Sequence, residues 1–279
     1  MPLTDRFEEQ IGEATIRVIA AKAGGFDGVV IRSGSRGEIL HDEDHGDLVA
    51  RLRAEAGKLH PNYYGIAGAI TRFLDFFPGG FQGRRYRSAD SERAYKVAAR
   101  KTLIETLPLE RARSATTADA IAIRDAFKPG RLWTNMPHTV ESTRIREILA
   151  GKNGPDYLRA AARFAEGDYA AGLAGIRAAA APHGHPSWPI ATYLPFLWLP
   201  ERHMFLKPTT TRDFAEHIGH PFAHEYEAGL DERVYRSLLD LAETTAIGIV
   251  DLKPEDRIDV QSFIWVVGEY REEDRLPTA

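Results

Sequence analysis

The sequence contains no cysteine, and this absence removes several kinds of chemistry at once. A chain without thiols forms no disulfide bond, holds no thiolate-bound zinc and has no cysteine nucleophile. Any catalysis must therefore use carboxylates, histidines, lysines, tyrosines or hydroxyl groups. The absence does not by itself assign the protein to a compartment.

The chain also lacks a long hydrophobic run and a secretory signal. Its most apolar stretch, Tyr193 to Pro200, is much shorter than the ~20 residues that cross a bilayer, and charged side chains follow it. The N-terminal residues contain neither a basic start nor an apolar core, so they do not resemble a signal peptide. We expect a cytoplasmic protein that does not enter a membrane.

A large excess of charge of either sign is absent as well. The 279 residues include 36 basic and 40 acidic side chains, a formal charge of −4, and 43% of them are hydrophobic. These values are typical of globular domains. They exclude a uniformly basic surface for nucleic acid and leave room for a local basic patch. We predict a single globular domain over 1–279, with a soft boundary near 130–151 as the alternative.

Several sequence motifs of common enzyme classes are missing. There is no phosphate-binding loop, no glycine fingerprint for dinucleotides and no Gly-x-Ser-x-Gly elbow, which argues against ATPases, kinases, Rossmann dehydrogenases and α/β-hydrolases. Three histidines, His217, His220 and His224, lack the spacing of a helical metal-binding pair, and Pro221 interrupts them. We therefore predict no metal ion and no cofactor.

The distribution of apolar residues predicts an α+β protein, mostly helical with a small N-terminal antiparallel sheet. Alternating or β-branched runs between glycine-rich turns predict strands at 15–20, 29–32 and 38–40. The Pro-rich, aromatic segment 182–200 is predicted to be a buried connector without a long helix. Helical spacing of apolar side chains predicts helices at 47–58, 64–77, 91–107, 117–127, 140–149, 156–164, 169–180, 211–218, 231–245 and 254–267.

The strongest local feature is a basic stretch from Gln82 to Lys101. It has seven basic and two acidic residues, a local charge of +5. Guanidinium groups suit phosphate oxygens, and the aromatic loop that ends at Phe81 is of the kind that wedges into a base stack. A solvated helix face beside a buried loop, or a site for a phosphorylated small molecule, has the same pattern. The basic residues predicted to contact nucleic acid are Arg84, Arg85, Arg87, Arg93, Lys96, Arg100 and Lys101.

A polar and aromatic turn at 60–63, His-Pro-Asn-Tyr, precedes the helix predicted at 64–77. In one interpretation Asn62 caps that helix. In the other, Asn62 hydrogen-bonds the edge of an extruded base while Tyr63 stacks on it. The second interpretation makes this turn part of a base-binding pocket.

Residues 185–187, His-Pro-Ser, resemble the start of the His-Pro-Ser-Pro-Leu-Ser motif of uracil-DNA glycosylases. The earlier Asp-Pro-Tyr-His motif of that family is similar to the turn at 60–63, which also comes first in this chain. No aspartate stands in this turn, and Trp188 replaces the second proline of the later motif. The resemblance implies that His185 contacts a base carbonyl, and we place Trp188 in the same pocket.

Two C-terminal segments, 203–209 and 258–265, resemble parts of uncharacterised bacterial proteins of restriction and DNA-modification loci. The resemblance implies DNA defence or repair but no fold or activity. Within the first segment, Lys207 has aromatic and apolar neighbours, which is typical of a desolvated amine nucleophile. The alternative is a lysine that pairs with a carboxylate or a helix end.

Together these features predict a bacterial, metal-independent DNA glycosylase of defence or repair, with phage or damaged DNA as its partner. Its predicted catalytic residues are Asn62, His185, Lys207 and Asp259. Glycosidic cleavage passes through an oxocarbenium-like state, which an acid such as Asp259 stabilises or an amine such as Lys207 attacks. The alternatives are a non-catalytic nucleic-acid-binding or adaptor protein with a protein partner, and an enzyme for a phosphate-bearing small molecule.

Overall fold

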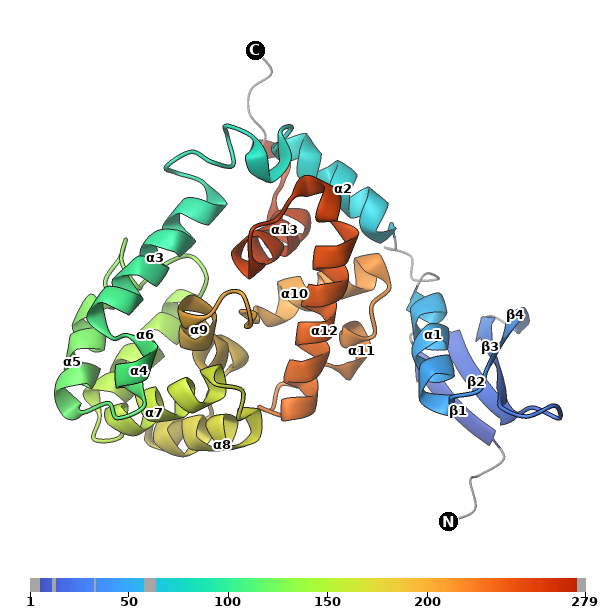
Figure 1. The fold of residues 1–279 in the computed structure, drawn as a ribbon, viewed down its shortest axis with the longest axis horizontal. Helices are drawn as coiled ribbons and strands as arrows, with labels where there is room; N and C mark the ends of the chain where they lie inside the picture. The colour runs from blue at the N-terminus through green and yellow to red at the C-terminus, as the bar shows by residue number, and fades with distance from the viewer. Residues whose placement is uncertain (1–5, 12–13, 33, 58–63, 275–279) are drawn as a thin grey trace. The chain divides into compact units, whose positions relative to one another are not determined.

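The computed structural model of the chain describes residues 6–11, 14–32, 34–57 and 64–274. These residues are mostly helical, with thirteen α-helices and an N-terminal four-stranded antiparallel sheet, which confirms the predicted fold class (Figure 1). The chain divides into two compact units, one of Met1–Thr71 with Arg212–Tyr226 and one of Arg72–Thr211 with Glu227–Ala279. Residues 130–151 lie inside the second unit.

The first unit opens with a four-stranded meander in the order β1-β2-β3-β4, antiparallel throughout. Its strands are β1 (Arg6–Ile11), β2 (Ala14–Ala20), β3 (Phe26–Arg32) and β4 (Ser35–Asp42). The sequence analysis missed β1 because Glu9 breaks its apolar alternation. Glu9 instead forms an ion pair with Arg53 of the following helix, with 3.0 Å between Arg53 Nη2 and Glu9 Oε2.

One helix, α1 (His45–Gly57), packs against the sheet and forms the core of this unit with it (Figure 1). Leu48 and Leu52 have no exposed surface. They lie over Gly28 of β3, where a Cβ atom would come within 2.4 Å of Leu52 Cδ1. Ile19 of β2 and Ile39 of β4, by contrast, are 46% and 69% exposed, so these strands carry apolar side chains outside that core.

Two helices, α2 (Gly65–Phe76) and α10 (Pro208–Ile218), begin in one unit and end in the other. Within the first unit, the Tyr64 N–H donates to the His217 carbonyl at 2.9 Å, and the two rings stack with centroids 4.6 Å apart. The short helix α11 (Phe222–Glu225) follows α10. Arg53 of α1 pairs with its last residue, Glu225, at 3.1 Å.

The second unit consists of helices. They are η1 (Gly80–Gln82), α3 (Glu92–Thr106), α4 (Leu109–Ala112), α5 (Thr117–Ala126), α6 (Thr139–Ala150), α7 (Gly154–Ala165), α8 (Tyr169–Ala180), η2 (Ala181–His183), α9 (Trp188–Trp198), α12 (Glu232–Gly248), η3 (Val250–Leu252), α13 (Arg257–Glu269) and η4 (Glu272–Asp274). The helices α7 and α8 pack closely. A Cβ atom added at Gly172 of α8 would lie only 2.5 Å from Phe164 Cβ of α7. None of the helices described here is long and apolar enough to cross a bilayer.

The segment 182–200 is mostly buried from Pro186 onward, as predicted, whereas Pro182, Gly184 and His185 are exposed, and it contains a helix that the sequence analysis did not predict. Helix α9 runs through it from Trp188 to Trp198, and all of its residues are buried. Pro189 lies in the first turn, where the missing N–H needs no helical partner. Pro195 lies in the last turn, so it interrupts the helix only near its end. Two prolines therefore fit a helix of this length.

Candidate functional site

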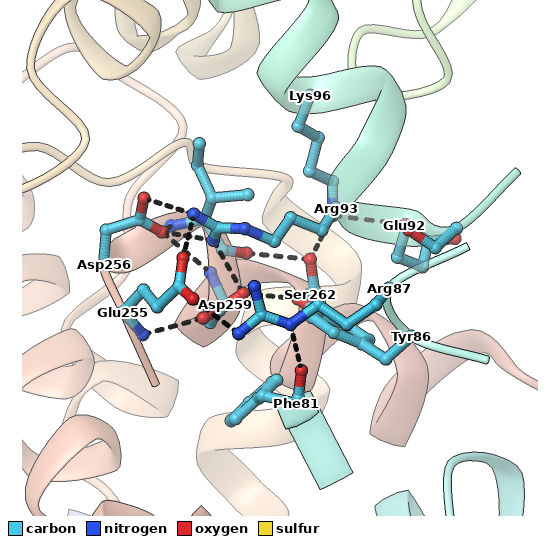
Figure 2. Close-up of polar contacts among 12 residues, drawn as sticks. Phe81, Tyr86, Arg87, Glu92, Arg93, Lys96, Glu255, Asp256, Asp259 and Ser262 are labelled. Carbon is cyan, nitrogen blue, oxygen red and sulfur yellow. Dashed lines mark hydrogen bonds and ion pairs between the residues drawn. The ribbon is translucent and has the colours of Figure 1, made fainter. Parts of the chain in front are cut away.

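Two helix N-termini of the second unit lie side by side and carry most of its buried charge. Helix α3 begins after Ser91, whose Oγ accepts the N–H of Ala94 at 3.1 Å. Helix α13 begins after Asp256, whose Oδ1 accepts the N–H groups of Ile258 and Asp259. Figure 2 shows that the polar side chains of these two regions point toward one another.

Asp259 lies at the centre of this network and is fully buried. It accepts hydrogen bonds from Tyr86 Oη at 2.7 Å, from Arg93 Nη1 at 2.8 Å and from the N–H of Glu255 at 2.7 Å (Figure 2). Burial, together with the charge of Asp259, raises the pKa of Tyr86, so Tyr86 stays a donor. Three donors and the lack of exposed surface make Asp259 an anchor of the fold.

Arg93 joins α3 to the start of α13. Its guanidinium lies 2.8 and 3.0 Å from the two carboxylate oxygens of Asp256, 2.8 Å from Asp259 and 2.9 Å from Glu255 (Figure 2). Burial acts to lower the pKa of Arg93, but the hydrogen bonds and charges of these carboxylates outweigh it and raise that pKa. The positive charge of Arg93 is thus compensated inside the protein.

Other cations of the basic stretch are also used internally. Arg87 donates to the Phe81 carbonyl at 2.9 Å and pairs with Glu255 at 2.5 Å (Figure 2). Arg85 donates to the carbonyls of Phe76 and Asp274, each at 2.6 Å. The stretch therefore offers far less free positive charge than its composition indicates.

Three cations of the stretch remain available. Lys101 is exposed, and its only ion pair among the described residues is a 3.9 Å contact with Glu105, which is also exposed. Exposed ion pairs of this kind contribute little to the stability of a fold. Arg84 is exposed and Arg100 half-buried, and neither has an ion-pair partner among the residues that the structure describes.

Lys96 places an amine in the interior of the second unit, with no exposed surface. Its Nζ lies 2.8 Å from Ser262 Oγ and 3.2 Å from Glu92 Oε2 (Figure 2). Burial lowers the pKa of Lys96, against the opposing effect of Glu92. Glu92 also accepts hydrogen bonds from Tyr95 at 2.8 Å and Tyr270 at 3.1 Å.

A second amine, that of Lys207, lies within electrostatic range of Lys96 and Glu92. Lys207 is half-buried just before α10, and its Nζ is 3.7 Å from the centroid of the Trp265 ring. The preceding residue is held by α9, because the Leu206 N–H donates to Thr192 Oγ1 at 3.1 Å.

Burial lowers the pKa of the Lys207 amine. The negative charges of Glu269, Glu141 and Glu92 oppose this shift without cancelling it. The positive charge of Lys207 in turn acts to lower the pKa of Lys96. Lys207, Trp265 and these carboxylates form the candidate functional site, which we call the Lys207 site.

Two predicted nucleic-acid contacts are core side chains. Phe81 has no exposed surface, and its ring packs 4.9 Å from that of Phe73 and 5.0 Å from that of Tyr86. Trp188 is 1% exposed, and its Nε1 donates to the Glu227 carbonyl at 2.8 Å. Neither ring is at the surface in this structure, so neither can stack on a base without a rearrangement of the core. The amine of Lys96 is also buried, so it cannot reach a phosphate without such a rearrangement.

The structure brings together five of the predicted site residues, namely Arg87, Arg93, Lys96, Lys207 and Asp259, in the region between α3, α13 and the start of α10. His185 lines a pocket beside the N-terminus of α9 together with Glu141, one of the carboxylates that act on Lys207. Asn62 and Tyr63 lie outside the described residues.

The sequence analysis missed Glu92, Ser262 and Trp265. Two spacings carried a usable signal. Glu92 and Lys96 are four apart, and Ser262 and Trp265 three apart, which places each pair on one side of a helix. What the spacing could not show is that the two helices face each other.

The described residues contain no group of three histidine, aspartate or glutamate side chains that could hold a metal ion. His220, for example, makes a different contact. Its Nδ1 accepts the N–H of Phe222 at 3.1 Å, within a turn.

Comparison of the chain with protein-family models, with curated proteins and with solved structures finds no match. The geometry and the chemistry of the Lys207 site are therefore the basis for a function.

Proposed function

We propose that the protein is a cytoplasmic DNA glycosylase of bacterial defence or repair, in which the amine of Lys207 attacks the sugar. The observation that supports this is a half-buried amine with a lowered pKa on the face of Trp265. Only the neutral form of an amine has a lone pair to donate, and a lowered pKa increases the neutral fraction at physiological pH.

The burial of Asp259 favours Lys207 as the reacting group. Asp259 has no exposed surface and already accepts hydrogen bonds from Tyr86, Arg93 and the backbone. A sugar cannot reach this carboxylate without breaking the network. Lys207 is half-buried rather than fully buried, and a nucleophile has to remain accessible.

The proposed step is a displacement at C1′ of the nucleotide. The lone pair of Lys207 Nζ forms a bond to C1′ while the C1′–N bond to the base breaks, and that bonding pair leaves with the base. The departing base gains one proton and the Lys207 nitrogen loses one. Opening of the sugar ring then gives an imine, which water hydrolyses to the free aldehyde and the amine.

The carboxylates around Lys207 fit this step. Positive charge develops at C1′, and negative groups placed beforehand near that charge stabilise it. Glu269 and Glu92 are close enough to affect the pKa of Lys207. Either carboxylate is also a suitable acceptor for the proton that the amine loses.

We propose that the phosphates of the DNA backbone bind to those cations that no carboxylate of the protein neutralises. Among the described residues of the basic stretch, Arg84 and Arg100 have no carboxylate partner, and Lys101 has only the exposed contact with Glu105 at 3.9 Å. Arginine and lysine contacts to phosphates position a nucleic acid without reading its sequence. The resemblance of 203–209 and 258–265 to proteins of DNA-modification loci supports the same substrate class.

The test is trapping with sodium borohydride, which reduces an imine to a stable amine. The full chain is incubated with oligonucleotides that each carry one modified base or one abasic site. We expect base release and a covalent protein–DNA adduct that maps to Lys207. Lys207→Met abolishes the adduct, whereas Lys22→Met, which removes an exposed amine outside the basic stretch, leaves it.

Two results would count against the proposal. Absence of base release on every substrate removes the glycosylase. Base release with no adduct, or with an adduct on another amine, keeps the enzyme class and removes Lys207 as its nucleophile.

A second candidate function is a non-catalytic nucleic-acid-binding or adaptor protein. It is favoured by the exposed Ile19 and Ile39 of the sheet, which suit a protein partner. The double variant Arg84→Ala with Arg100→Ala separates the two functions. Both predict weaker and less salt-dependent DNA binding, but only the enzyme loses turnover as well.

A further inference from the structure

A pocket of the second unit lies at the N-termini of α6 and α9, and it shares Glu141 with the Lys207 site. Its volume is about 260 Å³, and its polar lining consists of His138, Glu141, Arg144, His185 and Ser187. This is below the ~300–1,000 Å³ of sites for drug-sized ligands, so the pocket suits a small group of a ligand.

Arg144 supplies the positive charge of this pocket. Among the described residues Arg144 has neither an ion-pair nor a hydrogen-bond partner. Its guanidinium lies against Gly184, where a Cβ atom would be 3.1 Å from Nη1. Gly184 has a φ of 93°, a conformation that residues with a Cβ rarely adopt, and without a side chain it leaves the guanidinium close to its backbone. A planar donor fork without a partner suits an oxyanion.

Two further groups can donate hydrogen bonds there. The Oγ of Ser187 is buried and has no partner, and it makes no capping bond to α9 although it stands at the N-cap. His138 caps α6 by accepting the Val140 N–H at its Nδ1, at 3.4 Å. A neutral imidazole that accepts at Nδ1 carries its hydrogen on Nε2, where it can be donated.

One lining group opposes an anion. Glu141 carries a negative charge, but its Oε2 accepts the N–H of His138 at 2.6 Å, in the capping box of α6. The carboxylate is thus already held by backbone. The first turns of α6 and α9 both border the pocket, and helix N-termini favour negative charge.

We infer that this pocket binds a phosphate group through Arg144, Ser187 and His138. The inference goes beyond the proposed glycosylase, since phosphate binding here requires nothing of Lys207. The phosphate comes either from a DNA backbone or from a free phosphate or phosphate monoester, and the chemistry of the pocket is the same for both.

The experiment is a calorimetric titration of the full chain with three probes. They are inorganic phosphate, a deoxynucleoside 5′-monophosphate, and a short single-stranded oligonucleotide without terminal phosphates. For at least one probe, we expect Arg144→Gln to weaken binding about tenfold, the usual scale of one charge-assisted hydrogen bond. Arg146→Gln is the matched control, because Arg146 is exposed on the same helix and does not line the pocket.

The probe that responds identifies the source of the phosphate. Loss of binding for phosphate or the monophosphate indicates a free ligand, and loss for the oligonucleotide alone indicates a DNA backbone. Ser187→Ala is the second variant, since it removes a hydroxyl that makes no bond in the fold, and it should weaken the same probe several-fold. The inference is overturned if no probe binds, or if neither variant weakens binding. Because nothing is trapped or cleaved, the result is independent of the borohydride test.

Discussion

The Nζ of Lys207 lies 3.7 Å from the centre of the Trp265 ring, so the amine has an aromatic face on one side. Two effects act on its proton. A cation–π contact favours the charged form by about 0.5–2 kcal/mol. Burial favours the neutral form, and the pKa of Lys207 is lowered. Burial outweighs the opposing charges of Glu269, Glu141 and Glu92, which distinguishes Lys207 from a lysine that merely pairs with a carboxylate.

The first prediction concerns the reactivity of Lys207. The neutral fraction of an amine rises as the pH passes through its pKa, so a lowered pKa brings this rise to lower pH. We expect acylation of Lys207 by a small anhydride to reach half its maximal rate below pH 10.5, the ordinary value for lysine. Peptide mass spectrometry after short pulses at different pH values measures this. Half-maximal reaction at or above pH 10.5 would contradict the assignment.

The second prediction concerns Arg93. In Arg93→Met the buried carboxylate of Asp259 loses its cation, and so does Asp256. Removal of one partner of a buried pair costs about 3 kcal/mol, because the other charge stays buried without compensation. We expect urea unfolding to show this loss. Arg84→Met, a change at an exposed arginine, should stay within about 0.5 kcal/mol of wild type. Equal stability of the two variants would show that the network does not hold α3 to α13.

The third prediction is a pH dependence of stability due to His203. This residue has no exposed surface, accepts the Tyr235 hydroxyl at Nδ1 and donates from Nε2 to the Ala165 carbonyl at 2.7 Å. Burial lowers the pKa of His203 from 6.5 to about 4, with a further contribution from Arg202. Between these two values the unfolded chain binds more protons than the folded one, so stability falls as the pH falls from 6.5 to 4.

The expected loss through His203 is about 3 kcal/mol over that range, from 1.36 kcal/mol for each pH unit of the shift. Urea titrations between pH 4 and pH 7 measure it. His203→Gln, which keeps a donor and an acceptor and does not titrate, should flatten the curve. A steep fall that persists in His203→Gln would assign the effect to other groups.

The fourth prediction concerns the contact between α7 and α8. In Gly172→Ala the new Cβ would meet the Cβ and backbone of Phe164 at 2.5–2.8 Å, so the helices must move apart. Overpacking of this kind costs about 2 kcal/mol. The control is Gly229→Ala, because a Cβ at Gly229 has no neighbour within 4 Å. Thermal unfolding should show a lower Tm for Gly172→Ala only.

The fold class could be predicted because local sequence patterns form the expected helices and strands in the structure. The helix predicted at 91–107 is α3 (Glu92–Thr106), and its start is set by the Ser91 cap. Local patterns fail where a residue serves a distant partner. In β1, Glu9 faces Arg53 rather than an apolar core, so the strand lacks the alternation from which strands are predicted.

The site was harder to predict for the same reason. The charge of +5 over Gln82–Lys101 counts only neighbours in the chain. The carboxylates that compensate Arg93 are Asp256 and Asp259, more than 160 positions later in the chain. Local charge is therefore a poor guide to surface potential where two helices exchange ion pairs. For Lys207 the local signal was better, because the apolar run that precedes it, Met204 to Leu206, is buried in the structure.

The first unit is made of two stretches of chain, which has a consequence for its synthesis. The ribosome releases the N-terminal stretch first, and the core between the sheet and α1, from Ile11 to Ala56, is complete at that stage. The ion pair between Arg53 and Glu225 has to wait until helices α3 to α9 of the second unit have been translated. The unit whose synthesis starts first is thus completed late. A nascent chain released before Glu225 would expose the C-terminal part of α1 without that partner.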